Sequence, residues 1–373
     1  MKHYIGMMSG TSLDGVDGVL VSAGDGPGHN LRMLAAAYQP FDAELRAAAM
    51  ALQTPGENEL HRDALLANRI SRVYAACAAE LLASTGLQAN VIQAIGAHGQ
   101  TVRHRPELGY TRQTINPALL AELSCIDVIA DFRSRDIAAG GQGAPLVPAF
   151  HHALFSQPGE CRVVANIGGI SNISILGDTA TTPVTGFDTG PGNMLMDGWI
   201  MQHKNLAFDA SGAWAASGVV HAGLLEVLRS DSFFARQPPK STGRDLFDLA
   251  WLASGLNGFD GVAPVDVQAT LLALTATTLA DAIAGSAPTA LAVYVCGGGA
   301  FNTQLLAQLE AALHARGLSS IVASTAVLGV SPTHVEALAF AWLARRFDQR
   351  LCGSLAAVTG ATGSRILGAL YPA

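Results

Sequence analysis

The segment GMMSGTSLDGVD, residues 6–17, places glycine, serine, threonine and two acids between short apolar runs. Backbone N–H groups in such a turn can form a concave anion site, and the hydroxyls of Ser9, Thr11 and Ser12 add donors. The segment has no lysine and does not fit the phosphate-binding pattern G-x-x-x-x-G-K-[ST]. Because Asp14 would repel a bare phosphate, we expect it to hold Mg²⁺ through water or to accept a hydrogen bond from a substrate hydroxyl. An ordinary polar hairpin is the alternative interpretation.

Two more glycine-rich segments follow apolar strands. In NIGGISNIS, Gly168 and Gly169 would let a ligand approach the backbone closely, so two such hairpins could hold a polyphosphate from both sides. In VCGGGAFN, a strand runs into Gly297, Gly298 and Gly299 and then into a helix, whose N-terminus favours negative charge. Three glycines there would also let a flat ring lie against the backbone. A tight strand-to-helix connection is the alternative for this third segment.

The segment GFDTGPGN contains Asp188 between a strand and a helix start. That position puts a carboxylate at the end of a sheet, where a general base could act. Aspartic proteases also contain Asp-Thr-Gly, but they need two such carboxylates that share a proton. This chain has no second Asp-Thr-Gly, which argues against a protease.

Other polar residues carry weaker signals. His98 and His104, with five residues between them and no nearby cysteine, make a poor metal site. Arg133 and Arg135 lie in a glycine-rich loop after a strand and are candidate ligands for a carboxylate or phosphate, or members of surface ion pairs. The motifs of serine hydrolases and zincins, G-x-S-x-G and H-E-x-x-H, do not occur.

The elements that would position these residues repeat one design. The opening segment is predicted to be a strand, a polar turn and a strand, and RVVANIGGISNISIL, residues 162–176, has the same pattern. Two such units, each followed by strands and helices, indicate duplicated α/β lobes. Apolar periodicity predicts helices at 58–86, 117–125, 265–284, 301–313 and 333–347, and strands at 91–99, 127–132 and 291–299.

The composition excludes several classes of protein. The chain has 373 residues and a formal net charge of −7, without a Lys/Arg block, so nucleic acid is not an expected partner. Its five cysteines lack a C-x-x-C pair, which indicates free thiols in a reducing compartment. The longest uncharged stretch, 282–308, is interrupted by glycines and a proline, so no membrane span is expected. We therefore expect a cytoplasmic protein.

The motif segments, taken together and in order, resemble the 1,6-anhydro-N-acetylmuramic acid kinase family of the actin, hexokinase and heat-shock ATPase superfamily. Any one segment is generic, whereas the ordered set is specific and covers essentially the whole chain. Residues 205–245 and the tail after 350 have no motif that can be matched. The segments are GMMSGTSLDGVD, GAHGQTVRH, ADFRSRDIAAGGQGAPLVPAFH, NIGGISN, GFDTGPGNMLMD and VCGGGAFN.

The resemblance implies an α/β fold of two actin-like, ribonuclease H-like lobes with ATP in a central cleft. The expected lobes are residues 1–135, completed by the segment after about 345, and residues 136–345. Asp188 matches the catalytic base of the family. The matched positions for ATP and phosphate are Gly10, Thr11, Ser12, Leu13, Asp14, Gly15, Val16, Asp17, Gly168, Gly169, Gly297, Gly298, Gly299 and Asn302. Those for the sugar are Asp14, Gln100, Thr101, Arg133, Asp188 and Glu336.

The resemblance also implies a reaction. Asp188 would activate water to open the 1,6-anhydro ring while O6 takes the γ-phosphoryl group of ATP, with Mg²⁺ as cofactor and Asp14 as a metal contact through water. A homodimer acting in cytoplasmic peptidoglycan recycling is expected. A kinase of an ordinary hexose or amino sugar would share these features, and so would a non-catalytic, nucleotide-switched binding protein.

Overall fold

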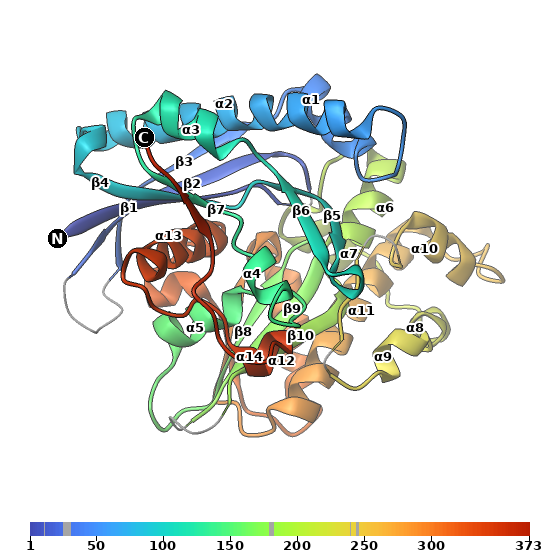
Figure 1. The fold of residues 1–373 in the computed structure, drawn as a ribbon. Coiled ribbons are helices and arrows are strands. Elements are labelled where there is room, and N and C mark those ends of the chain that lie inside the picture. Colours follow the sequence, from blue (N-terminus) through green and yellow to red (C-terminus); the bar gives the residue numbers. More distant parts are fainter. Residues whose placement is uncertain (11, 25–30, 179–182, 239, 244–245) are drawn as a thin grey trace. The chain divides into compact units, whose positions relative to one another are not determined.

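The computed structural model describes residues 1–373 except 11, 25–30, 179–182, 239 and 244–245. The chain forms two compact units, Met1–Leu154 together with His334–Ala373, and Phe155–Thr333 (Figure 1). The boundaries expected from sequence were 135/136 and about 345, so residues 136–154 and 334–345 lie in the first unit instead of the second. Each unit has its own sheet and its own hydrophobic core.

The sheet of the first unit is mixed. Its first strands in the chain, β1 to β3, pair antiparallel, and β4 runs parallel to β1 on the other side. The turn between β1 and β2 is the first glycine-rich segment. The strands follow the order β13-β7-β4-β1-β2-β3, and their bounds are β1 Lys2–Met8, β2 Gly15–Ala23, β3 Leu31–Pro40, β4 Ile92–Ala97, β7 Val128–Ala130 and β13 Ala369–Tyr371.

Helices cover both faces of this sheet, with α2 and α3 on one face and α13 on the other (Figure 1). α13 approaches the strands closely because Gly6 and Gly96 have no side chain. A Cβ on Gly6 would lie 2.0 Å from the carbonyl oxygen of Ala337, and one on Gly96 would lie 2.1 Å from that of Phe340. The elements are α1 Ala43–Ala51, α2 Glu59–Thr85, α3 Pro117–Ser124, α4 Ser134–Ile137, α5 Val147–Phe155, α13 Val335–Asp348 and α14 Ala356–Thr359, with the hairpin β5 Gln100–Arg105 and β6 Tyr110–Thr114.

The sheet of the second unit repeats this topology. Its strand order, β10-β9-β8-β11-β12, places the first strand of the unit in the middle, two antiparallel strands on one side and two parallel strands on the other. The first unit has the same arrangement, so the expected duplication of α/β lobes is confirmed. The strands are β8 Arg162–Ile167, β9 Ile170–Leu176, β10 Thr185–Pro191, β11 Ala292–Cys296 and β12 Ile321–Ser324.

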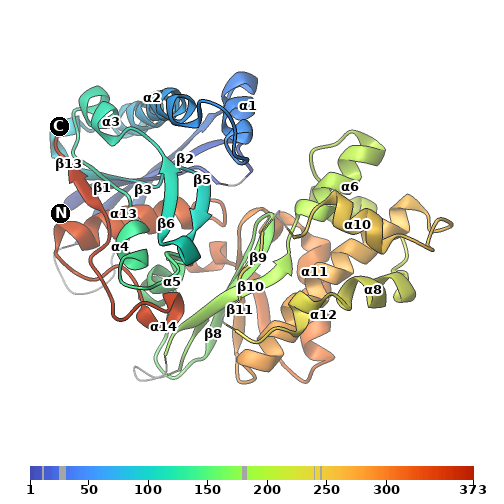
Figure 2. The ribbon, with the colours of Figure 1, turned by 45° about the vertical axis from the view of Figure 1, so that its right-hand side comes forward.

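The helix α11, Pro264–Ser286, forms the core of the second unit and packs against β9, β10 and the helices α6, Met194–Lys204, and α12, Thr303–His314 (Figure 2). Its residues are apolar nearly all round, as in a helix that is buried on most sides. In the described part of the chain, α11 is the one helix long and apolar enough to cross a membrane, and most of it is buried inside the unit.

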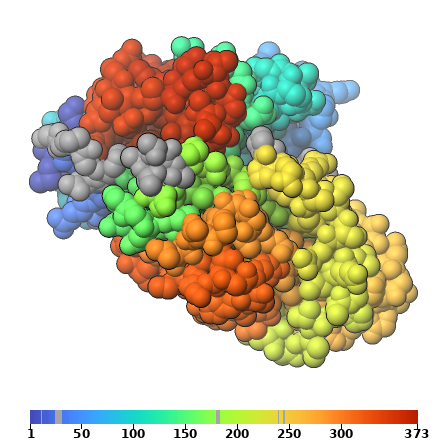
Figure 3. Space-filling view, turned by 90° about the horizontal axis from the view of Figure 1, so that it is seen from below, coloured from blue at the N-terminus to red at the C-terminus, as the bar shows by residue number. Residues whose placement is uncertain are grey.

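The described residues between 205 and 260, a range that includes the segment 205–245 without a recognisable motif, form short helices between α6 and α11. Figure 3 shows them, in yellow-green and yellow, as a continuous part of the surface next to the orange residues of α12. These helices are α7 Ala213–Ala216, α8 Ala222–Arg229, α9 Ser232–Ala235 and α10 Leu249–Gly255.

Candidate active site

The first glycine-rich loop, between β1 and β2, is tied to the segment after β4 by a cycle of hydrogen bonds. The hydroxyl oxygens of Ser9 and Tyr74 are 3.0 Å apart, and the Ser9 hydroxyl donates to the Gly99 carbonyl at 3.1 Å. The Gly99 N–H donates to the Tyr74 hydroxyl at 3.2 Å. With Tyr74 donating to Ser9, every hydroxyl in this cycle donates once and accepts once. The Ser9 hydroxyl is therefore used within the protein.

Other described residues of this loop also make hydrogen bonds or pack within the protein. The Gln100 side-chain amide donates to the Gly10 carbonyl at 3.0 Å, and the Ser12 hydroxyl donates to Asp14 Oδ1 at 2.7 Å. The side chains of Leu13 and Val16 lie in the core. Thr11 is outside the described residues. Phosphate contacts by the described part of the loop would thus come from backbone N–H groups.

Two carboxylates of the first unit, Asp14 and Glu336, act on a third, Asp17. Burial raises the pKa of Asp17 to about 6, with further contributions from the negative charges of Asp14 and Glu336. Gly15, which separates the two aspartates, packs against Tyr38, because a Cβ there would lie 2.7 Å from the tyrosine ring. Within the described residues, no group of three or more His, Cys, Asp or Glu side chains is arranged to hold a metal ion directly. The negative charges that act on Asp17 nevertheless fit a cation carried by a nucleotide, with the carboxylates contacting it through water.

A half-buried cation, Arg133, lies close enough to Glu336 for the two charges to act on each other. The Arg133 guanidinium donates through Nε to His98 Nε2 at 3.0 Å and through NH1 to the Gly143 carbonyl at 2.8 Å. Burial lowers the pKa of Arg133 to about 10, and the charge of Glu336 acts against this effect. Burial, and then the charge of Arg133, lower the pKa of His98 well below its usual value, so a neutral imidazole accepts the bond. Thr101 Oγ1 accepts from the Gln113 amide at 3.1 Å.

In the second unit, the turn Gly168–Gly169 between β8 and β9 is held by the start of α6. The N–H of Gly192 donates to the Gly169 carbonyl, and that of Asn193 donates to the Gly168 carbonyl, both at 2.8 Å. A Cβ added to either turn glycine would meet nothing closer than 3.7 Å. The packing of the protein therefore does not require glycine at 168 and 169, and the space beside them is open to a ligand.

The triple-glycine segment packs against the end of β8, which leads into that turn. Gly297 has a φ of 77°, and a Cβ there would lie 2.5 Å from Asn166 Oδ1. A Cβ on Gly299 would lie 2.4 Å from the Ile167 side chain, whereas one on Gly298 would meet Asn193 at an ordinary 3.5 Å. Asn302 caps α12, because its Oδ1 accepts from the Leu305 N–H at 3.0 Å. Packing thus explains why glycine is needed at 297 and 299, and helix capping explains the Asn302 side-chain oxygen. Packing does not require glycine at 298.

Asp188 lies in β10, opposite Asn172 of β9, and the strand register shifts between Asp188 and Gly190. Such bulges redirect side chains and are frequent near active sites. Its Oδ2 accepts from the Thr242 N–H at 2.9 Å, and its own N–H donates to the Lys240 carbonyl at 3.1 Å. Burial raises the pKa of Asp188 to about 6, against the opposing effect of the Thr242 bond. A carboxylate of this kind is ionised at neutral pH and basic enough to accept a proton.

The structure therefore brings the predicted residues together within each unit. In the first unit, the loop of residues 9–17 lies with Gln100, Arg133 and Glu336. In the second unit, Gly168–Gly169, Asp188 and the triple glycine lie at one end of the sheet. The Ser9 hydroxyl was expected to donate to phosphate, but it bonds Tyr74 and the Gly99 carbonyl instead. Sequence reasoning missed Tyr74, His98, Lys240 and Thr242 as partners, because each acts on a residue distant in the chain or through its backbone.

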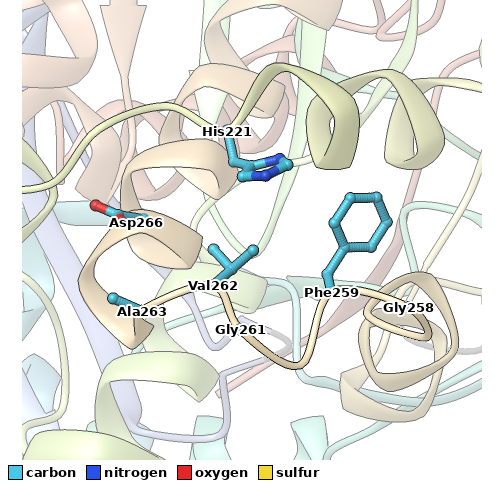
Figure 4. Close-up of a pocket in the computed structure, with 7 residues that line it drawn as sticks. All are labelled: His221, Gly258, Phe259, Gly261, Val262, Ala263 and Asp266. Carbon is cyan, nitrogen blue, oxygen red and sulfur yellow. The ribbon is translucent and has the colours of Figure 1, made fainter.

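A hollow elsewhere in the second unit does not include any predicted site residue. It lies between α8 and the segment before α11, and His221 and Phe259 face each other across it edge to face, with ring centroids 5.3 Å apart (Figure 4). Its polar side chains serve the fold: His221 Nδ1 accepts from the Leu224 N–H, and Asp266 accepts from the Val219 N–H.

Comparisons with known proteins agree with this geometry. The model of the family described as "Anhydro-N-acetylmuramic acid kinase" matches residues 2–373. The chain is 57% identical over 371 residues to the anhydro-N-acetylmuramic acid kinase of Burkholderia cenocepacia, covering 99% of this chain and 96% of the relative. It is 56% identical over 377 residues to that of Burkholderia thailandensis, covering 99% and 97%.

A solved structure shows the same fold at low sequence identity. Component A of the (R)-2-hydroxyglutaryl-CoA dehydratase of Acidaminococcus fermentans matches with a TM-score of 0.51 and 10% identity, covering 91% of this chain and 96% of that one. This likeness extends over both units and confirms the expected actin-like α/β fold. The sequence relatives confirm the predicted kinase activity and support ATP as the phosphoryl donor. The chain belongs to the anhydro-N-acetylmuramic acid kinase family.

Proposed function

We propose that the protein opens the 1,6-anhydro ring of anhydro-N-acetylmuramic acid with water and phosphorylates O6 with ATP, giving N-acetylmuramic acid 6-phosphate and ADP. Asp188 takes one proton from water, and the water oxygen forms a bond to C1 on the face opposite the departing O6. The C1–O6 bond breaks, O6 bonds to the γ-phosphorus, and the bond from that phosphorus to the β–γ bridging oxygen breaks. Capture of O6 by phosphorus takes the place of the general acid of a glycosidase.

The environment of Asp188 carries this proposal. The carboxylate lies near the open Gly168–Gly169 turn, since β10 pairs with the strand that follows the turn. Burial raises its pKa to about 6, and the Thr242 N–H holds Oδ2. Among the described residues, no hydrogen bond to Oδ1 is seen, which leaves this oxygen for a water molecule. A general base needs this combination of a fixed orientation, one open oxygen and a pKa near the working pH.

The glycine-rich loops would hold the nucleotide. Backbone N–H groups of Gly10, Ser12 and Gly169 would contact the phosphates, since those of Leu13 and Gly168 already donate to the Gly10 and Ile170 carbonyls, and the segment 297–299 would lie beside the adenosine. Arg133 and Gln100 would contact the sugar. Mg²⁺ bound to the nucleotide would neutralise phosphate charge, with Asp14, Asp17 and Glu336 of the first unit contacting it through water or orienting the sugar. Burial is the main cause of the raised Asp17 pKa, and the added effect of the Asp14 and Glu336 charges supports a cation in this place.

The decisive experiment uses Asp188→Asn, with the exposed Asp260→Asn as a matched control in the same unit. Both are incubated with ATP, Mg²⁺ and anhydro-N-acetylmuramic acid in ¹⁸O-labelled water. The wild type and the control should place label at C1 of a 6-phosphorylated product. Asp188→Asn should bind ATP normally and lose about 10²–10⁴-fold in turnover, the usual effect of removing a general base. Unlabelled product from the wild type, or near-normal turnover by Asp188→Asn, would refute the mechanism.

We further propose that the enzyme acts as a homodimer in the cytoplasm, in the recycling of peptidoglycan fragments. This part rests on family membership. Sedimentation equilibrium at micromolar concentration should give twice the chain mass of 38.5 kDa. A single-chain mass across that range would contradict it.

A further inference from the structure

The segment that follows α8 builds a small core of its own. Asp231 begins it, with Oδ1 accepting from the Phe233 N–H at 2.8 Å and Oδ2 accepting from the Trp251 indole N–H at 2.9 Å. Phe233 and Phe247 are fully buried and pack edge to face, with ring centroids 5.5 Å apart. Trp251 packs on Phe247 in the same way, at 5.0 Å. We call Phe233, Phe234, Phe247 and Trp251 the aromatic cluster; it gives these residues a fixed local structure.

The aromatic cluster lies directly on the strand that carries Asp188. α9 contacts β10, and the ring of Phe234 touches the backbone of Gly190. A Cβ on Gly190 would lie only 2.7 Å from that ring. Because Gly190 is the residue at which the β10 register resumes after the bulge, the cluster packs against the strand where Asp188 is redirected.

Lys240 joins the aromatic cluster to Asp188. Its ammonium donates to the carbonyls of Phe233 and Phe234, at 3.2 and 3.3 Å, and lies 4.7 Å from the centroid of the Phe233 ring. These carbonyls at the end of α9 need donors, and the aromatic face attracts a cation. The backbone of the same lysine accepts the Asp188 N–H, and two residues later the Thr242 N–H holds Asp188 Oδ2.

We propose that Lys240 is a positioning residue for Asp188, because its side chain anchors the segment of residues 240–242, whose backbone accepts the Asp188 N–H at one end and donates to the Asp188 carboxylate at the other. This inference rests on the proposed role of Asp188 as the base. The contacts of the ammonium are with Phe233 and Phe234, so it acts on the carboxylate through the Thr242 N–H. The hydrogen bond from the Thr242 N–H favours the ionised carboxylate. If the segment of residues 240–242 loosens, the pKa of Asp188 should therefore rise and its side chain should be able to rotate.

The test compares Lys240→Met with Lys204→Met. Lys204 is an exposed lysine of the same unit whose ammonium also lies over a ring, 5.6 Å from the Trp214 centroid, without a link to Asp188. The pH dependence of kcat/KM is measured between pH 5 and 9 for both. In Lys240→Met the acid limb should move up by about one pH unit, which lowers the rate about fivefold at pH 6, while the KM for ATP changes by less than about twofold. Lys204→Met should follow the wild type.

Two further variants separate positioning from folding. Lys240→Arg keeps a cation with donors and should restore most of the wild-type profile. Where thermal unfolding shows that Lys240→Met is not folded, Lys240→Gln, which keeps an NH₂ donor, replaces it under the same criteria. An acid limb and kcat equal to wild type in a folded Lys240→Met, or a loss seen only in the KM for ATP, overturns the inference. Asp188→Asn distinguishes this failure from failure of the mechanism: an active Asp188→Asn removes both proposals, whereas an inactive one leaves the mechanism standing.

Discussion

Asp188 and Asp17 are the acids whose titration should be visible in the activity. Burial raises the pKa of each to about 6, and nearby negative charges add to the effect at Asp17. A raised pKa means that the folded protein holds these protons to a higher pH than a free aspartate does. A base acts only when it is ionised, so the active fraction is complete well above pH 6 and halves at the pKa.

The resulting prediction is an acid limb in kcat/KM centred near pH 6. Below it the rate should fall about tenfold for each pH unit. Measurement with constant ionic strength between pH 4.5 and 9 tests this, and Asp17→Asn separates the two acids. If Asp188 is the base, the limb persists in Asp17→Asn at a similar pH. A limb that disappears in this variant would instead assign the titration to Asp17.

For single residues, the sequence predicts which residues belong to the site better than it predicts the groups that they bond. Asp188 and the paired glycines are recognisable because their neighbours in the chain define a strand end or a turn. The hydroxyl of Ser12 was expected to face phosphate, but it donates to Asp14 two residues away. Ser9 binds Tyr74, which lies on a distant helix, and Lys240 acts on Asp188 through its backbone. No local pattern carries such information, because these contacts exist only after the elements have packed.

Among the elements, the glycine turns divide into those that the fold needs and those that it does not. Gly169→Ala places its Cβ in ordinary contact, 3.7 Å from Met194, whereas Gly299→Ala would meet Ile167 at 2.4 Å. We therefore expect Gly169→Ala to unfold within about 1 kcal/mol of the wild type in urea while its KM for ATP rises about tenfold or more. Gly285→Ala, with open space around it on α11, is the control and should change neither quantity. A normal KM in Gly169→Ala would mean that no phosphate lies against this turn.

The hydrogen bonds between Tyr74 of α2 and the first glycine-rich loop lead to a second prediction at this scale. Tyr74→Phe removes the hydroxyl that accepts from the Gly99 N–H and bonds Ser9, leaving buried polar groups without a partner. The free energy of unfolding should fall by about 1–3 kcal/mol. Urea denaturation measures it, with the exposed Tyr110→Phe as a control expected within about 0.5 kcal/mol of the wild type. Equal stability of the two variants would show that the cycle contributes nothing.

The elements with strong periodicity were predicted, and those without it were missed. The helix expected at 58–86 is α2, and the strands expected on either side of both glycine hairpins are present. β3, Leu31–Pro40, was not predicted, since its run of alanines carries little strand preference although its residues alternate in burial. The helices of residues 205–260 were also missed, because most are one or two turns long and depend on the aromatic cluster and on α11 for their stability.

For the whole molecule, the repeated strand–turn–strand pattern predicts the duplication, but chain order misplaces the domain boundary. α13 follows the second unit directly in sequence, yet it packs on β1 and β4 of the first. The reason is steric: Gly6 and Gly96 leave a groove in the first sheet that only a closely packed helix fills, and α13 is buried nearly all round. The expected boundary near residue 345 therefore differs from the observed one, and residues 334–345 belong to the first unit.

This arrangement predicts how the chain can be divided. Residues 155–333 are continuous and contain a complete sheet and core, so this fragment should fold alone and unfold cooperatively in urea. Residues 1–154 lack α13 and β13, which would expose the groove at Gly6 and Gly96 and one edge of the sheet, so this fragment should not show a cooperative transition. Adding residues 334–373 as a separate peptide should restore the transition, because α13 buries the apolar face that the fragment leaves open. Circular dichroism of the three samples tests this, and cooperative unfolding of residues 1–154 without the peptide would contradict it.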